Sequence, residues 1–241
     1  MEPKKPPALP AGFLDLYASE PRMGDDPALH GGRIRQHPHT VGLWPSHVYI
    51  EWLPSADEAQ RLEQAVPAGA TSLVFSPRKA PLPLHLSLSP PIMLKTSDRK
   101  SFFNNLEDIL HAKSQFTIVF RVDETGKVVW VTNPENTRDF FVLVVQTSPE
   151  IDGVIAAVSS VSKNLSYPVL LADHVPHVSL AWRLHSDNHD QPRPAKRFRT
   201  DTKSQSETTE QFVILVDTIK VKIGRSIHRI LLSRRRGEPL P

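Results

Sequence analysis

Two short stretches of the chain place a histidine two residues before a serine. The first reads LHLSLS and contains His85 and Ser87, and the second reads HVSLAW and contains His177 and Ser179. An imidazole can accept or donate a proton near neutral pH, and a hydroxyl can donate a hydrogen bond to a phosphate oxygen. Two such pairs would serve phosphodiester cleavage, in which one histidine activates the attacking oxygen and the other protonates the leaving oxygen.

The alternation of both stretches predicts two β-strands, each with a polar and an apolar face. Side chains at positions i and i+2 of a strand share a face, so each histidine lies beside its serine. One such match would arise by chance in a chain with 11 histidines, but two in separate strands favour a shared site. In the second strand the expected polar face holds His177, Ser179 and Ala181, and the expected apolar face holds Val178, Leu180 and Trp182.

Helix signals lie between the strand patterns. Ser55 and Glu58 form a capping box, residues 97–114 place apolar side chains on one helical face, and Pro149 follows Ser148 at the first position of a helix. Strands are expected over residues 47–53, 71–75, 84–89, 116–122, 127–131, 139–146, 177–184, 212–224 and 226–232.

Two pairs of these strands are expected to form hairpins. The strands 116–122 and 127–131 flank turn residues, and the strands 212–224 and 226–232 close the fold. The order of strands and helices predicts an α+β protein of two pseudo-symmetric sheet-and-helix lobes around a central cleft.

Composition divides the chain into segments. Residues 1–32 are mostly irregular, and residues 33–184 and 211–233 form a single two-lobed domain. Residues 185–210 lose all hydrophobic pattern and are expected to be a disordered basic insertion, because they bury too little apolar surface to offset the entropy of ordering. Residues 234–241 form a basic tail.

The overall composition excludes some classes of protein and site. The 241 residues include no cysteine, which excludes disulfides and zinc sites built from thiolates. No apolar stretch is long enough to cross a bilayer, so we expect no membrane partner. The net charge of +3 is a weak indication of a polyanionic partner.

The paired motifs resemble the H-x-[ST]-x signature of the 2H phosphoesterase superfamily. The fuller texts HLSLS and PHVSLAW, with KIG in the closing hairpin, are similar to the U6 small nuclear RNA phosphodiesterase family over roughly residues 33–232. This resemblance implies a nuclear 3'-to-5' exonuclease that trims the uridine tail of that RNA and leaves a 2',3'-cyclic phosphate or a 3'-phosphate. It also implies a reaction without metal or cofactor, and we expect a monomer that binds single-stranded RNA.

The resemblance implies roles for the motif residues. His85 and His177 would be the general acid–base pair, with His177 favoured as the base, and Ser87 and Ser179 would bind the phosphate. A rival for the role of His177 is His174, which precedes it by three residues in an expected loop.

Further RNA contacts are expected outside the two motifs. The family often places an aromatic residue shortly before the second motif to stack on the terminal base; here Leu171 is near that place and Tyr167 lies further back. Lys220 and Lys222 are candidates for phosphate contacts, although lysines also protect exposed strand edges.

Two other functions fit the same residues. One is a 2H-type cyclic phosphodiesterase or RNA ligase that acts on small nucleotides or tRNA. The other is a non-catalytic RNA-binding module, which would not require both histidines.

Overall fold

The computed structural model describes residues 40–122, 128–185 and 210–234. All helices and strands named below belong to one compact unit that begins at Val41. The N-terminal segment 1–32 lies outside the described residues, and so do nearly all of the insertion 185–210 and of the tail 234–241. Their predicted characters therefore remain predictions.

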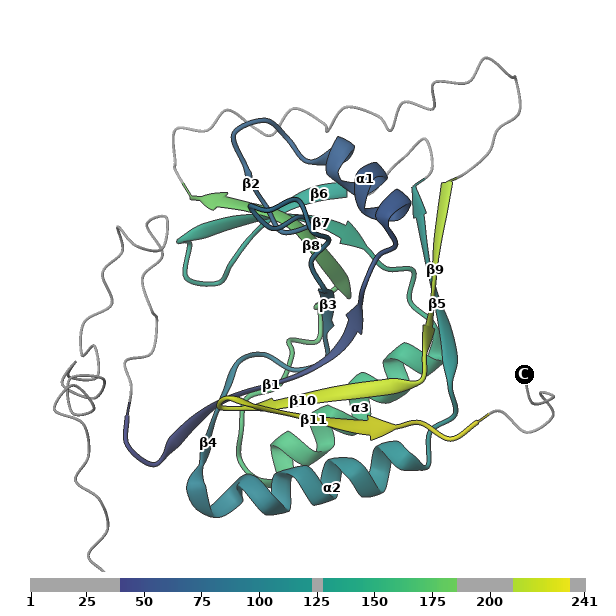
Figure 1. Ribbon diagram of the computed structural model, residues 1–241. Helices are drawn as coiled ribbons and strands as arrows, with labels where there is room; N and C mark the ends of the chain where they lie inside the picture. The colour runs from purple at the N-terminus through teal and green to yellow at the C-terminus, as the bar shows by residue number, and fades with distance from the viewer. Residues whose placement is uncertain (1–39, 123–127, 186–209, 235–241) are drawn as a thin grey trace, which may run out of the picture. The chain divides into compact units, whose positions relative to one another are not determined.

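The order of elements mixes strands and helices along the chain (Figure 1). The helices are α1 (Ala56–Ala65), a short 3-10 turn (Thr96–Asp98), α2 (Arg99–His111) and α3 (Pro149–Asn164). The strands are β1 (Leu43–Trp52), β2 (Thr71–Ser72), β3 (Leu84–Ser87), β4 (Ile92–Lys95), β5 (Phe116–Val122), β6 (Val128–Thr132), β7 (Arg138–Val144), β8 (His177–Leu184), β9 (Glu210–Val216), β10 (Thr218–Ile223) and β11 (Ser226–Leu231).

One long sheet brings the two motif strands together. Its order is β11-β10-β1-β3-β8-β7-β6, with β2 paired to β8 and β4 paired to β1. Strand β3 carries the first His-x-Ser motif and lies directly between β1 and β8, and β8 carries the second. The predicted α+β class is confirmed, and strands from the two predicted lobes join edge to edge where β3 meets β8.

The helices begin where the sequence signals place them. The Ser55 hydroxyl accepts from the Glu58 backbone N–H at 3.3 Å, and the Glu58 carboxylate accepts from the Ser55 backbone N–H at 2.7 Å, which completes the capping box of α1. Ser148 caps α3 ahead of Pro149. Helices α2 and α3 pack against each other, and α2 also contacts β11 (Figure 1). None of the helices described is long and apolar enough to span a membrane.

The core lies on the apolar face predicted for the motif strands. Leu84 and Leu86 of β3 and Val178 and Leu180 of β8 are almost wholly buried. They share one hydrophobic core cluster with residues of α2, α3 and the neighbouring strands. Burial of these side chains, each contributing about 2 kcal/mol, fixes which way the strands face.

The expected facing of Ala181 and Trp182 is wrong. Ala181 is fully buried like Leu180, whereas Trp182 is only half-buried. The register between β7 and β8 shifts at this point: Phe141 pairs with Ala181, but Val142 pairs with Ser179. This β-bulge interrupts the two-residue period, so alternation holds for the motif and fails directly after it.

The expected hairpin of residues 116–122 with 127–131 is also wrong. Strand β5 pairs with β9 in a separate two-stranded sheet, and β6 pairs with β7. The expected strand 212–224 divides at Asp217 into β9 and β10, and only β10 forms the closing hairpin with β11. Both errors have one cause: periodicity predicts a strand but does not specify its partner.

Candidate active site

Polar side chains from four neighbouring strands gather on one face of the sheet. Tyr49 of β1 lies opposite Ser87 of β3, and Glu51 lies opposite His85. Directly paired residues of antiparallel strands point to the same face. The opposite edge of β1 pairs with β10, where Lys222 lies across from His47 and Lys220 across from Tyr49. The sheet register therefore places on this face the residues His47, Tyr49, Glu51, His85, Ser87, His177, Ser179, Lys220 and Lys222.

The four predicted motif residues are brought together by the pairing of β3 with β8. Leu86 lies opposite Val178, and both are buried. The residues before and after each of them consequently point to the other face. These are His85 and Ser87 on β3 and His177 and Ser179 on β8. The backbones of the two strands lie roughly 4.8 Å apart, the usual spacing of neighbouring strands.

The side chain of His85 is exposed to solvent, and two aromatic rings lie beside it. The ring of His47 lies edge-on to it with centroids 5.5 Å apart, and the ring of Tyr49 lies at 5.8 Å. Burial by these surroundings lowers the pKa of His85, nearby His177 lowers it further, and the Glu51 carboxylate acts in the opposite direction. His85 is therefore mainly neutral at pH 7 in the free protein.

His177 is oriented by its own preceding loop. Its Nδ1 atom lies 2.8 Å from the backbone carbonyl oxygen of Val175. A carbonyl can only accept, so Nδ1 carries the proton and donates it, and in neutral His177 the Nε2 atom keeps its lone pair. The ring of His174 lies 5.5 Å from that of His177, and its Nε2 atom is buried without a hydrogen-bond partner in the described part of the chain.

His47 and Tyr49 are site residues that our sequence reasoning missed. The Nε2 atom of His47 lies 3.1 Å from the Ser87 hydroxyl oxygen, and its ring stacks on Tyr49 with centroids 5.3 Å apart. Burial lowers the pKa of His47 to about 4, and His85 and Lys222 lower it in the same direction. The signal was present in HVYIE, where residues 47, 49 and 51 alternate with buried ones.

The two predicted lysines differ in their surroundings. Lys220 forms an ion pair with Glu51 inside the polar face. Lys222 is exposed, lies across from His47 and contributes positive charge to its surroundings. The site thus joins the imidazole rings and serine hydroxyls of both motifs to an exposed lysine at its edge, a set suited to binding a phosphate and moving protons.

Comparison with known proteins assigns this arrangement to a family. The HVSL family model, described as "Uncharacterised conserved protein", matches residues 7–231. U6 snRNA phosphodiesterase 1 of Neurospora crassa is 30% identical over 99% of this chain and 78% of its own length. The chain belongs to the U6 snRNA phosphodiesterase family. The protein of the same name from Schizosaccharomyces pombe is 28% identical over 92% of this chain and 88% of its own length.

Solved structures agree with this family at the level of the fold. Kluyveromyces marxianus Usb1 with uridine monophosphate aligns at a TM-score of 0.56 and 17% identity, over 78% of this chain and 98% of that one. Without the nucleotide, the same protein aligns at a TM-score of 0.53 and 14% identity. This chain therefore shares the Usb1 fold.

The two base-stacking candidates suggested by the family resemblance have different surroundings. The Tyr167 hydroxyl donates to the Asp98 carboxylate at 2.6 Å and accepts from the Lys95 backbone N–H at 3.0 Å. Lys95 pairs with Leu43, four residues along β1 from His47 and so about 13 Å away. Leu171 is largely exposed in the loop before β8. Tyr167 thus anchors the start of α2, whereas Leu171 lies nearer to the His177 motif along the same connection between α3 and β8.

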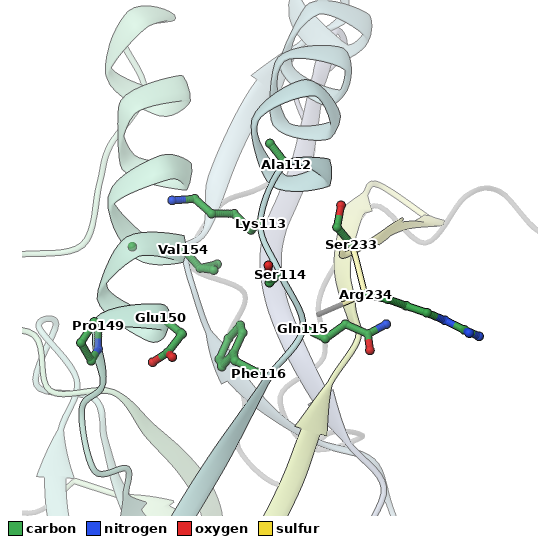
Figure 2. A pocket seen from close by; sticks show the side chains of 11 residues that line it. Ala112, Lys113, Ser114, Gln115, Phe116, Pro149, Glu150, Val154, Ser233 and Arg234 are labelled. Atoms are coloured by element: carbon green, nitrogen blue, oxygen red, sulfur yellow. The ribbon is translucent and has the colours of Figure 1, made fainter. Parts of the chain in front are cut away.

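A hollow elsewhere in the molecule is distinct from the histidine face. It is lined by the end of α2, the start of α3 and the segment after β11, with Lys113, Glu150 and Arg234 among its polar residues (Figure 2). No predicted site residue lines it. The proposed chemistry accordingly belongs to the sheet face.

Proposed function

We propose that this chain is a 3'-to-5' RNA exonuclease that trims the 3' oligouridine end of U6 small nuclear RNA by two-histidine catalysis without a metal. The observation that supports it most is that both His-x-Ser motifs point to one face of the adjacent strands β3 and β8. The relatives named U6 snRNA phosphodiesterase 1 supply the substrate class.

The reaction begins with the 2'-hydroxyl next to the scissile phosphate. His177 removes its proton through Nε2, the nitrogen left free by the bond from Nδ1 to Val175. The 2'-oxygen then bonds to phosphorus, the bond from phosphorus to the 5'-oxygen breaks, and His85 gives its proton to that oxygen. The products are a 2',3'-cyclic phosphate on the shortened RNA and a released nucleoside with a 5'-hydroxyl. Addition of water to the cyclic phosphate would give a 3'-phosphate.

In this mechanism His85 takes up its proton when the substrate binds. The pKa of His85 is lowered in the free protein, so few molecules carry the proton at pH 7 before RNA binds. A phosphodiester anion beside the ring favours the charged imidazolium and raises its pKa. Substrate binding and protonation of the acid are therefore linked in this mechanism.

The remaining polar residues hold the RNA. Ser87 and Ser179 donate hydrogen bonds to the non-bridging phosphate oxygens and stabilise the charge that develops there. Lys222, exposed at the edge of the histidine face, contacts a neighbouring phosphate. The RNA binds as a single strand because the reacting sugar and phosphate must lie directly against the sheet. We infer a nuclear monomer, in keeping with a small nuclear RNA substrate.

A chelator-treated assay on an RNA with a 3' oligouridine end tests this proposal. Wild type should shorten the RNA from its 3' end in the chelator, whereas His85→Ala and His177→Ala should each lower the rate by about 10²–10⁴-fold. Product ends are identified by mass spectrometry. Activity that survives either substitution, or that stops with chelator alone, contradicts the mechanism.

The same proteins distinguish the alternative functions. Efficient hydrolysis of a mononucleotide cyclic phosphate, or joining of tRNA halves, without trimming of the oligouridine RNA would indicate the related 2H-type enzymes. Binding of the RNA without cleavage by wild type would indicate an RNA-binding module.

A further inference from the structure

The histidine face continues past the second motif along β7 and β8, which lie side by side (Figure 1). Val142 of β7 pairs with Ser179, and the next residue of β7 on the same face, Phe140, pairs with Trp182. Paired residues of antiparallel strands share a face, and so do residues i and i+2 of one strand. Leu180 is the extra residue of the bulge, so Trp182 points to the same face as Ser179 although it follows by three positions.

The composition of the core agrees with this facing. Phe141 and Leu143 of β7 belong to the hydrophobic core cluster, whereas Val142 between them is fully buried outside it. The cluster, as the described residues define it, also includes neither Phe140 nor Trp182, and both of these are half-buried. The two aromatic rings therefore lie on the side of the sheet that carries the His-x-Ser motifs, and each keeps part of its surface open to solvent.

The two rings belong to a row of paired residues that crosses four strands. Phe140 pairs with Val131 of β6, which is 40% exposed. Trp182 pairs with the exposed Thr71 of β2. The guanidinium carbon of Arg138, two residues before Phe140 on β7, lies 5.4 Å from the centre of the Trp182 ring. Phe140, Trp182 and Arg138 together form what we call the aromatic platform, an aromatic surface with a cation beside it and no carboxylate in its row.

The aromatic platform lies at the end of the motifs where His85 stands. The antiparallel register of β3 and β8 places His85 across from Ser179. His177 and Ser87 form the next pair in the direction away from the platform. Trp182 is one row beyond Ser179, roughly 7 Å along the sheet. Of the two histidines, His85 is therefore the nearer to the platform.

We propose that the aromatic platform binds the base of the departing 3'-terminal nucleotide, which stacks against Trp182 and Phe140. The proposal rests on the function proposed above, in which His85 protonates the 5'-oxygen of that nucleotide. Bases of single-stranded RNA stack on aromatic side chains, and the Arg138 guanidinium adds a positive charge that attracts the RNA. Stacking of this kind tolerates every base, so the platform holds the nucleotide in place without selecting uridine.

A cycle that pairs a protein variant with an altered RNA tests the proposal. Wild type and Trp182→Leu are assayed on the oligouridine RNA and on the same RNA whose 3'-terminal nucleotide lacks its base, with kcat and KM determined separately. Loss of the stacked ring should lower kcat/KM on the intact RNA about tenfold. Most of this loss should appear in KM, because stacking acts before as well as during the reaction. On the RNA without the terminal base, the substitution should change kcat/KM less than about twofold, because the interaction is already absent.

Further variants guard against a purely structural effect. Trp182→Phe keeps an aromatic ring and should retain kcat/KM to within about threefold of wild type, and Phe140→Leu should lower it by about threefold. Trp130→Leu is the matched control, because Trp130 pairs with Phe141 on the opposite face of the same sheet and has the Arg183 guanidinium 4.1 Å from its ring centre. It should leave kcat/KM unchanged, and thermal unfolding of all variants shows whether they are folded.

The outcomes separate this inference from the proposed function. Wild-type kcat/KM in Trp182→Leu, or an equal loss on the RNA without its terminal base, would overturn the role of the platform. Coupling of Trp182 to the base of the penultimate nucleotide would overturn its assignment to the departing one. A changed oligomeric state in size-exclusion chromatography with unchanged RNA kinetics would show that the platform binds a second protein chain instead. An inactive wild type or an active His85→Ala would overturn the phosphodiesterase mechanism itself.

Discussion

The two His-x-Ser motifs have the same spacing and the same strand geometry, yet different structures support them. The surroundings of His85 come from the neighbouring strand β1, through His47, Tyr49 and Glu51. His177 is instead oriented by Val175, a residue of the loop that leads into its own strand.

This difference indicates how each histidine can be adjusted. The protonation of His85 depends on side chains that substitution can change, because burial and nearby His177 lower its pKa and Glu51 raises it. The orientation of His177 depends on a backbone carbonyl, which no side-chain substitution removes. Neighbouring side chains therefore set the pKa of His85, whereas the backbone before β8 sets the orientation of the His177 ring.

The serines of the two motifs should be equivalent despite this difference. Ser87→Ala and Ser179→Ala are each expected to lower kcat about 10²-fold, because each removes one donor to the phosphate. Rates on the oligouridine RNA at saturating substrate measure the effect. If only one of the two variants is impaired, the motifs share a geometry but not a chemical role.

The Glu51 carboxylate should affect the His85 motif in a pH-dependent way. Because Glu51 raises the pKa of His85, Glu51→Gln lowers that pKa further, and fewer His85 rings are protonated at any given pH. In the bell-shaped profile of kcat/KM, the limb that belongs to His85 should move to lower pH. Glu107→Gln, on the exposed face of α2, is the control. Unchanged limbs in Glu51→Gln would show that β1 does not set the protonation of His85.

Lys222 should have the smallest effect, and on binding rather than on chemistry. Lys222→Gln is expected to weaken RNA binding about threefold at moderate salt and to reduce the slope of log K against log salt by about one. Titrations at several salt concentrations measure both quantities. Lys100→Gln on α2 is a matched exposed lysine and should leave the slope unchanged. An equal response of the two variants would remove Lys222 from the RNA path.

The motif faces could be predicted from sequence because a strand buries alternate residues. His85 and Ser87 lie on the face away from the buried leucines of β3, as expected. His177 and Ser179 likewise lie on the face away from the buried Val178 and Leu180 of β8. The prediction failed one residue later, because the bulge at Leu180 and Ala181 is a property of the pairing with β7 and leaves no mark in the local pattern.

The supporting residues could not be assigned because they depend on which strands are neighbours. His47 and Tyr49 stand in an alternating run as clear as the motifs themselves. Their role appears only when β1 is placed beside β3, a pairing between residues 32 to 38 positions apart, from Trp52 with Leu84 to Tyr49 with Ser87. The incorrect hairpin of β5 with β6 has the same origin, since β5 in fact pairs with β9, which follows the insertion.

The pairing of Leu86 with Val178 makes the buried side of the sheet part of the catalytic machinery. Because β3 and β8 run antiparallel, this register sets His85 across from Ser179 and Ser87 across from His177, so the two histidines lie on a diagonal of the motif face. Backbone hydrogen bonds fix the distance between the strands, whereas the buried side chains fix the register, because a slip of one residue would turn a motif toward the core. The mutual placement of acid and base is thus held by apolar side chains on the opposite side of the sheet.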